Sequence, residues 1–360
     1  MASMTKTTAG QETRPSNRAD WIDIAKAMSI LLILVGHGMG TVDAIGQDAS
    51  LVEGFVMMLT PVRIPMFFLI SGIFAAKLFE SPRERFIERV ADLAKVYVLW
   101  SVITYAWRIT LFPEYSPELT SVGISGILDE LLLPTPFPWF IWALVVFNIL
   151  GYVGTRTAPK TTLALAAFSA FAGYYIPVYL PGTHTVAGVG FYRNFLFFIL
   201  PFYLPHIRQW AERRSTIPTA SLAGIVYCLL LAAGEVAGDG FLGSLAMVTA
   251  SLIGIISLLM IARMLEASPL RRPLTKVGQK TLPIYLMHVI FMMGLALLLE
   301  EAGVYTGPFA NLLIIVGITI VSAVASMKAE EIMPKPMRAF LFIEKRESKE
   351  AKTSPVMQTL

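Results

Sequence analysis

The sequence predicts an all-α, polytopic membrane protein with about ten transmembrane helices. Of its 360 residues, 55% are hydrophobic and only 15% are charged, and the mean hydropathy is +0.65. Soluble domains contain about 25% charged residues, so this chain has too little polar surface to cover a large soluble bundle. Many apolar stretches also reach about 18 residues or more, which is long enough for a helix to cross a bilayer. A third observation, the charge of the connecting segments, supports the same class.

Hydropathy and the positions of helix-breaking residues give ten predicted spans. They are residues 21–40, 52–78, 93–112, 138–155, 162–180, 191–205, 217–235, 242–264, 282–301 and 308–327. The connections alternate between segments rich in Lys and Arg and segments that contain neither residue. The positive-inside rule places the basic segments in the cytoplasm. Both termini are then cytoplasmic, which agrees with an even number of spans.

The chain divides into three predicted parts. Residues 1–20 form a cytoplasmic segment without the apolar core of a secretory signal, so the first span is expected to serve as an uncleaved insertion signal. Residues 21–327 form the membrane domain, and residues 328–360 form a cytoplasmic, partly disordered tail. Residues 80–92 predict an amphipathic helix on the inner membrane surface. Residues 127–133 predict a short interfacial segment on the outer side.

Several classes of function are excluded by what the sequence lacks. It contains no P-loop, no Gly-x-Ser-x-Gly elbow, no His-Glu-x-x-His pair and no dinucleotide-binding fingerprint. ATP-driven transport and zinc proteolysis are therefore unsupported. The single cysteine, Cys228, forms no internal disulfide and is expected to be a small core residue. We expect no metal, no permanently bound cofactor and no nucleic-acid partner, and membrane lipid is the expected surroundings.

The first span contains the most informative residues, Asp23, Lys26 and His37. Ionisable groups in a membrane helix are costly, at roughly 2.5–3.5 kcal/mol for a mid-helix Lys, and they usually mark function. Eleven helical residues advance about 16 Å and end about 20° past three turns, so Lys26 and His37 share one face. Asp23 is placed to pair with Lys26. Two structural alternatives stay open: a snorkelling Lys26, and a His37 hydrogen-bonded in a helix interface.

Three arginines depart from the inner-side distribution of positive charge. Arg63 lies inside the second span, and Arg108 and Arg193 lie near outer ends of the third and sixth spans. Buried guanidinium groups need carboxylates, phosphates or carbonyls as partners. Structural pairing and substrate binding are equally open for Arg63, whereas structural pairing is favoured for Arg108 and Arg193. The candidate structural partners are Glu53, Glu114, Asp129, Glu130 and Asp239.

Other candidate residues lie on later apolar segments. Pro65 and the Ser71–Gly72 pair are expected to kink the second span or to open its backbone beside a cavity. Trp139 belongs either to an interfacial aromatic belt or to a sugar-stacking surface. His288, which follows Tyr285 in the ninth span, belongs either to a helix interface or to a site.

These residues resemble motifs of the acyltransferase-3 family of integral membrane O-acyltransferases, from residue 20 to about the tenth span. Asp23-x-x-Lys26 followed by ten residues and His37 is similar to the family's first-helix motif, in which Arg is commoner than Lys. Pro65-Met-Phe-Phe-Leu-Ile-Ser71-Gly72 is similar to the Phe-Phe-x-x-Ser-Gly motif.

Further motifs follow in the family's order. Arg63 stands where many relatives have a His, and the segment from Arg85 to Arg89 resembles the basic segment after the second helix. Pro138-Trp139-Phe140 is similar to the Trp-Phe motif. Thr281-Leu-Pro-Ile-Tyr285-Leu-Met-His288 is similar to the late Tyr/His motif. Each motif is short, but five in the right order are specific.

The resemblance implies transfer of an acyl group from cytoplasmic acyl-coenzyme A to a sugar hydroxyl of an exported, cell-surface or lipid-linked glycan, at the bacterial inner membrane. The acyl group is most often acetyl, with succinyl as the alternative. His37 is the expected general base or transient acyl carrier, Lys26 contacts the donor, and Asp23 orients Lys26. The expected substrate-binding residues are Arg63, Ser71, Trp139, Tyr285 and His288, and the expected coenzyme-binding residues are Arg83, Arg85 and Arg89.

Two other functions remain open at this stage. Ten spans, interrupted helices and buried arginines also suit a secondary transporter or exporter of an acidic or glycan substrate, although no repeat relates the two halves. A non-catalytic relative that acts as a scaffold is the third reading.

Overall fold

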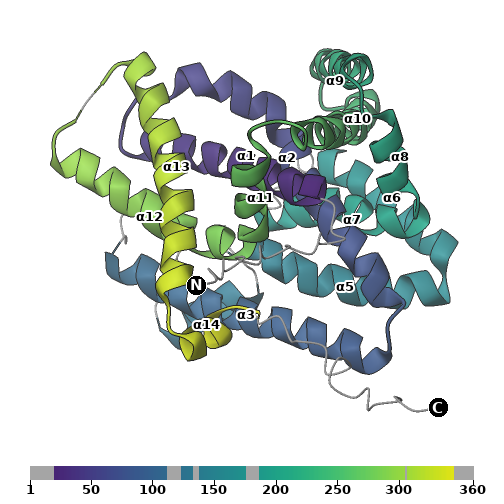
Figure 1. Cartoon of the computed structure of the whole chain (residues 1–360), viewed down its shortest axis with the longest axis horizontal. Coiled ribbons are helices and arrows are strands. Elements are labelled where there is room, and N and C mark those ends of the chain that lie inside the picture. The colour runs from purple at the N-terminus through teal and green to yellow at the C-terminus, as the bar shows by residue number, and fades with distance from the viewer. Residues whose placement is uncertain (1–19, 112–122, 133–137, 176–185, 305, 344–360) are drawn as a thin grey trace, which may run out of the picture.

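The computed structural model describes residues 20–111, 123–132, 138–175, 186–304 and 306–343, and within these ranges it contains helices and no strand (Figure 1). The helices are α1 (Asp20–Ala44), α2 (Ser50–Phe79), α3 (Arg83–Leu111), α4 (Ile124–Leu132), α5 (Trp139–Thr157), α6 (Pro159–Tyr175), α7 (Val186–Tyr203), α8 (Ile207–Arg214), α9 (Ile217–Ala237), α10 (Phe241–Leu265), α11 (Arg271–Gln279), α12 (Thr281–Glu301), α13 (Pro308–Ile332) and α14 (Lys335–Leu341).

The protein is a polytopic helical membrane protein, as predicted. Each predicted span coincides with one of the long helices α1, α2, α3, α5, α6, α7, α9, α10, α12 and α13. Seven of them are long and apolar enough to cross a membrane within the described residues, and these are α1, α2, α5, α9, α10, α12 and α13. The described parts of α6 and α7 are shorter and border residues 176–185, which lie outside the described ranges.

Three local expectations are corrected or refined. Residues 80–92 do not form a separate surface helix, because α3 begins at Arg83 and continues unbroken to Leu111. No Pro or Gly interrupts that stretch, so the amphipathic segment and the span join in one helix. The outer segment expected at residues 127–133 is helical, as α4. Cys228 is exposed on α9 rather than in the core, because its neighbour Tyr227 takes the buried side.

The chain after residue 327 begins as folded structure. The last span continues to Ile332, and α14 follows it. The indole of Trp100 on α3 donates a hydrogen bond to the Leu341 carbonyl, with the two atoms 2.8 Å apart. The Trp100 and Phe342 rings also lie 5.8 Å apart, so α14 is fastened to α3 (Figure 1). The predicted tail therefore starts with an anchored helix.

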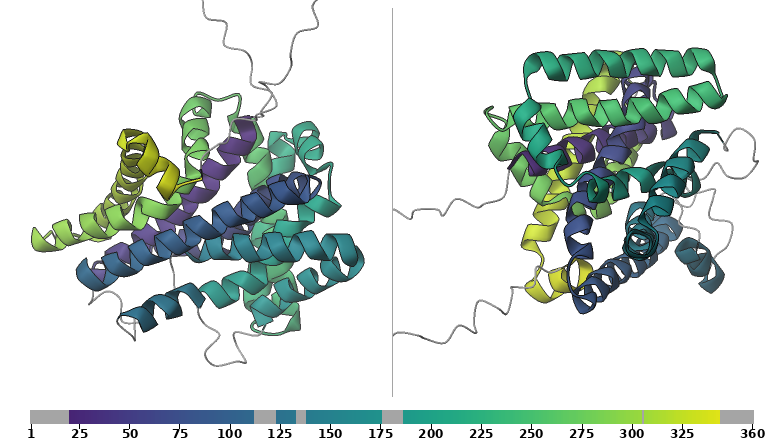
Figure 2. Two further views of the ribbon diagram at one scale, coloured as in Figure 1. Left: turned by 90° about the horizontal axis from the view of Figure 1, so that it is seen from below. Right: turned by 90° about the vertical axis from the view of Figure 1, so that its right-hand side faces the viewer.

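Helices α1 and α2 form the centre of the bundle. Helix α1 packs against α2, α10, α11, α12 and α13, and α2 also packs against α7. Glycines permit two of these approaches: a Cβ at Gly72 would overlap the Phe198 carbonyl of α7, and one at Gly278 would overlap the Asp23 carbonyl of α1. Small residues of this kind let membrane helices approach at the backbone. The α9–α10 hairpin lies along one flank (Figure 2).

Candidate active site

The deepest part of the site contains two histidines from different helices. The rings of His37 on α1 and His288 on α12 are 5.2 Å apart between centroids, and His288 is fully buried. The Nδ1 atom of His288 lies 3.0 Å from the Ile284 carbonyl and 2.8 Å from the Tyr285 carbonyl. Carbonyls only accept hydrogen bonds, so Nδ1 carries the hydrogen and, in the neutral ring, Nε2 keeps the lone pair. The structure thus brings together two residues selected from separate motifs.

Arg63 of α2 reaches the same level of α1. Its guanidinium lies against Gly36, the residue before His37, so closely that a Cβ at Gly36 would overlap Nη1. The Nε atom of Arg63 is buried and has no hydrogen-bond partner within the described residues. No ion pair of the described residues includes Arg63. A cation therefore lies beside His37, and no anion among the described residues pairs with it.

Aromatic packing joins three of the sequence motifs beside this centre. The backbone N–H of Phe140 on α5 donates to the Tyr285 hydroxyl of α12 at 3.1 Å. The Phe68 ring of α2 lies 4.5 Å from Phe140 and 5.9 Å from Trp139. Trp139 is 6% exposed, and a Cβ at Gly190 would come within 2.6 Å of its ring. Trp139 therefore lies inside the helix bundle, in contact with α2 and α7.

Ser71 is placed by its own helix. Its hydroxyl donates to the Phe67 carbonyl one turn earlier, at 2.9 Å. Helix α2 is continuous through Pro61 and Pro65, so the expected opening of the backbone is absent. The neighbouring Gly72 serves the contact with α7 described above.

A large open cavity lies at the predicted cytoplasmic ends of α1 and α2. Its volume is about 1020 Å³, and its polar lining consists of Lys26, Lys77, Glu80 and Arg89. The remaining lining is apolar and comes from α1, α2, the end of α7 and the start of α8: Ile22, Ile73, Phe74, Ala76, Pro201, Phe202, Leu204, Pro205 and Ile207. Three cations and one carboxylate make this cavity attractive to an anionic ligand.

The two ionisable residues at the start of α1 pair as predicted. The Lys26 ammonium lies 2.5 Å from the Asp23 carboxylate, whose residue is fully buried. The Gln279 side chain of α11 donates to the other Asp23 oxygen at 3.4 Å. Asp23 therefore holds Lys26 at the cavity wall, and α11 holds Asp23.

The remaining predicted residues divide between the site and the periphery. Arg89 lines the cytoplasmic cavity, whereas Arg83 and Arg85 are exposed at the start of α3 and outside that lining. Arg193 donates to the Gly173 carbonyl at 2.8 Å and stacks 4.1 Å from the Tyr174 ring. These contacts are of the structural kind favoured for Arg193, but the partners are a carbonyl and an aromatic ring instead of a carboxylate.

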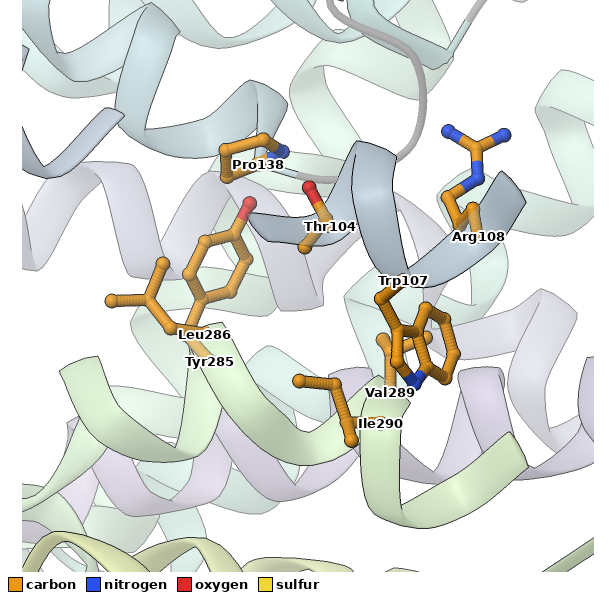
Figure 3. A pocket seen from close by; sticks show the side chains of 8 residues that line it. All are labelled: Thr104, Trp107, Arg108, Pro138, Tyr285, Leu286, Val289 and Ile290. Atoms are coloured by element: carbon orange, nitrogen blue, oxygen red, sulfur yellow. The ribbon is translucent and has the colours of Figure 1, made fainter. Parts of the chain in front are cut away.

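Arg108 is buried near the predicted outer side, beside a small cavity of about 10 Å³ that Thr104, Pro138 and Tyr285 also line (Figure 3). This volume is about that of one water molecule. The Tyr285 hydroxyl points toward Pro138 there, and the Arg108 guanidinium points away from Tyr285 (Figure 3).

Lys77 and Gln279 face the site, although the sequence did not mark either of them as a candidate site residue. Lys77 lines the cytoplasmic cavity, and Gln279 contacts Asp23. Lys77 resembles any basic residue at the end of an inner-side span. Gln279 lies in the short polar helix α11, which no sequence pattern brings to α1, whereas the structure joins the two helices at Gly278. In the described ranges, no three His, Cys, Asp or Glu residues gather as a metal site would require.

Comparison with known proteins identifies the family of the chain. A family profile described as an acyltransferase domain matches residues 19–328. The chain belongs to the acyltransferase-3 family. It is also similar to nodulation protein NolL of Mesorhizobium japonicum, with 26% identity over 168 residues, which cover 46% of this chain and 43% of the relative. The match thus spans less than half the length of that relative. No solved structure matches the chain. The chain is therefore a multi-pass membrane protein of the acyltransferase-3 family.

Proposed function

We propose that this acyltransferase moves an acyl group from cytoplasmic acyl-coenzyme A to a sugar hydroxyl of an exported or cell-surface glycan, at the bacterial inner membrane. Acetyl is the simplest donor group. The observation that carries the proposal is the course of α1, which runs from the cavity wall at Lys26 to the buried centre at His37. About 16 Å of helix separates the two, so one long ligand can reach both.

The cytoplasmic cavity suits the nucleotide end of coenzyme A. Its volume, about 1020 Å³, is at the upper end of ordinary ligand pockets. Lys26, Lys77 and Arg89 supply positive charge for the phosphate groups. The apolar part of the wall suits the pantetheine arm, which leads the thioester along α1. Arg83 and Arg85, exposed nearby on the same helix as Arg89, add long-range attraction.

The chemistry needs a base for the acceptor hydroxyl. His37 accepts the hydroxyl proton while the oxygen attacks the thioester carbonyl carbon. The carbon–sulfur bond breaks, an ester bond forms, and the proton leaves on the coenzyme A thiol. His288 is fully buried, so we assign it to positioning His37 rather than to contact with the sugar. Its Nδ1–H is held by carbonyls, which leaves Nε2 to receive an N–H from the His37 ring.

The aromatic residues act one step further from the chemistry. The contacts of Trp139 and Tyr285 hold α5 against α2 and α12, beside His288. We therefore assign Trp139 and Tyr285 to shaping the site, and Ser71 with Gly72 to seating α2 against α7. We therefore assign glycan recognition to the outer ends of the helices. The glycan acceptor itself follows from the family resemblance.

The first test is NMR of surface glycan purified from wild-type, deletion, His37→Ala and His206→Ala strains. We expect ester-linked acyl signals to disappear in the deletion and His37→Ala strains, at normal protein levels. His206 is an exposed histidine bonded to Gln209 at 2.7 Å, so its variant should retain the signals. Intact ester signals in the His37→Ala strain would refute the mechanism. Intact signals in the deletion would exclude that glycan as the product.

A further inference from the structure

Arg63 differs in its partners from Arg193 and Arg156. Arg193 is satisfied by the Gly173 carbonyl and the Tyr174 ring, and Arg156 donates to the Phe79 carbonyl and lies 3.7 Å over the Tyr152 ring. Arg63 has no hydrogen bond and no ion pair within the described residues, and its Nε is buried. A buried cation is stable only when an anion or other acceptor meets it. The described residues supply none at Arg63.

The position of Arg63 excludes the usual external partner, a lipid headgroup. Arg63 lies near the middle of α2 (Ser50–Phe79), roughly 20 Å or more of helix from either end. A snorkelling arginine reaches the interface only from near a helix end. The partner must therefore be a ligand that enters the bundle.

The location of the guanidinium shows which ligand can meet it. Gly36 accommodates the guanidinium, since any side chain at this position would overlap Nη1. The next residue along α1 is His37, where the proposed reaction takes place. An anionic group of a substrate bound at His37 is thus brought to Arg63, whose buried Nε has no hydrogen-bond partner within the described residues. A guanidinium also matches a carboxylate geometrically, since it can donate two parallel hydrogen bonds.

We propose that Arg63 and Gly36 form a subsite for a substrate carboxylate, and this inference rests on the proposed function. The carboxylate belongs either to the acyl group, which is then a dicarboxylic half-thioester such as succinyl, or to an acidic sugar of the acceptor. The carboxylate only binds to Arg63 and does not react. The transfer step therefore breaks and forms the same bonds as in the proposed function: the carbon–sulfur bond of the thioester breaks and the ester bond forms. Arg63 is then a specificity-determining residue, and the transferred group or its acceptor is acidic.

The test uses the full-length protein in lipid nanodiscs and measures coenzyme A release. The donor arm compares kcat/KM for succinyl-coenzyme A and acetyl-coenzyme A. The acceptor arm compares neutral oligosaccharides with uronic-acid oligosaccharides of equal length. We expect wild type to prefer the acidic partner in one arm, which identifies the source of the carboxylate. Arg63→Gln should lower that preference by about 10- to 100-fold, the effect of losing a charged hydrogen-bond pair, because the loss is larger for the acidic partner than for the neutral one.

Matched glycine variants keep the test valid if Arg63→Gln folds poorly. Gly36→Ala leaves the arginine in place but displaces its guanidinium, so it should reduce the same preference. Gly40→Ala is the control, because a Cβ at Gly40 meets nothing within 4 Å on the same helix. Arg63→Lys retains charge and should retain part of the preference.

Two outcomes would overturn the proposed carboxylate subsite, and a third would count against the proposed function. An equal loss for acidic and neutral partners in both arms overturns the proposal, because Arg63 would then act on the reacting carbonyl common to all substrates. Equal kcat/KM for acidic and neutral partners in the wild type also overturns it and leaves the proposed acyl transfer standing. No release of coenzyme A by the wild type from any donor would instead count against the proposed function.

Discussion

At the scale of single residues, the site depends on how two histidines use their nitrogen atoms. His288 commits its Nδ1–H to the Ile284 and Tyr285 carbonyls, so the His37 ring, 5.2 Å away between centroids, meets the other side of a fixed imidazole. A histidine held in this way presents the lone pair of its other nitrogen in a fixed direction. In the proposed mechanism, His288 orients the base His37 without contacting the substrate.

We predict that His288→Ala lowers kcat about 10- to 100-fold, because the orientation of His37 is lost, and leaves the KM for the donor unchanged. His37→Ala should lower kcat by about 10² to 10⁴. Both are measured as coenzyme A release in nanodiscs, with His206→Ala as the unchanged control. A raised KM at normal kcat in His288→Ala would mean that His288 binds substrate.

The buried Asp23–Lys26 pair gives a stability prediction. Asp23 is 0% exposed, and removing its charge leaves the Lys26 ammonium in a half-buried position without its carboxylate. Breaking a buried pair costs about 3–5 kcal/mol, so Asp23→Asn should lower the midpoint of thermal unfolding. The double variant Asp23→Asn with Lys26→Met should regain stability and stay inactive, because Lys26 is assigned to the donor. A double variant as unstable as the single one contradicts this account.

At the scale of elements, two glycine contacts position the helices that carry the site. Gly72 seats α2 on α7, and Gly278 seats the short helix α11 on the backbone of α1 at Asp23. In the second contact, α11 also supplies Gln279 to the Asp23 carboxylate. Arg271 of α11 pairs with Asp20 at 2.6 Å, so three interactions fix the start of α1. The cavity wall at Lys26 is therefore held from the side of α11.

We predict that Gly278→Ala destabilises the protein by about 1–3 kcal/mol, the usual effect of forcing extra atoms into a packed contact, because the obstructing atoms belong to the α1 backbone. It should also raise the KM for the donor, since α1 and Lys26 must shift. The readouts are thermal unfolding and coenzyme A release. Gly294→Ala on α12, where a Cβ meets nothing within 4 Å, is the control. Unchanged thermal stability in Gly278→Ala would contradict this prediction, because it would show that α11 can move away from α1 without loss of stability.

At the scale of the whole molecule, apolar side chains face outward and charged ones gather at the predicted cytoplasmic end. Helix α9 exposes Leu222, Ile225 and Leu229, which suits a lipid-facing surface. At the predicted cytoplasmic end, Lys26, Lys77 and Arg89 line one open cavity. The fold thus offers a charged entrance from one side and an apolar surface to the bilayer.

We predict that the KM for acyl-coenzyme A rises several-fold as salt increases from about 50 to 500 mM, because salt screens attraction between the cavity cations and the phosphate groups. Lys77→Ala should weaken this salt dependence without changing kcat. An acyl thioester of N-acetylcysteamine, which lacks phosphates, should show no such dependence. If the KM of both donors showed the same dependence on salt concentration, the cavity cations would not be the groups that attract the phosphate groups of the donor.

Sequence and structure contributed differently to the candidate site. The Asp23–Lys26 pair was predictable, since helical spacing places residues three apart on one face. The contact of Arg63 with Gly36 was not, because it depends on how α2 lies on α1. The roles of Ser71 and Trp139 were equally unpredictable: the same residue types suit a cavity or a packed interface, and burial alone distinguishes them.

The sequence by itself determined the membrane class, the positions of the ten long helices and the family motifs. These properties depend on local hydropathy, on helix-breaking residues and on short spacings along the chain. Only the tertiary structure decided which motif residues meet: His37 with His288, Arg63 with Gly36, and Asp23 with the α11 glycine. The first and last of these pairs join segments about 250 residues apart, and helix packing, which no local pattern encodes, sets their distances.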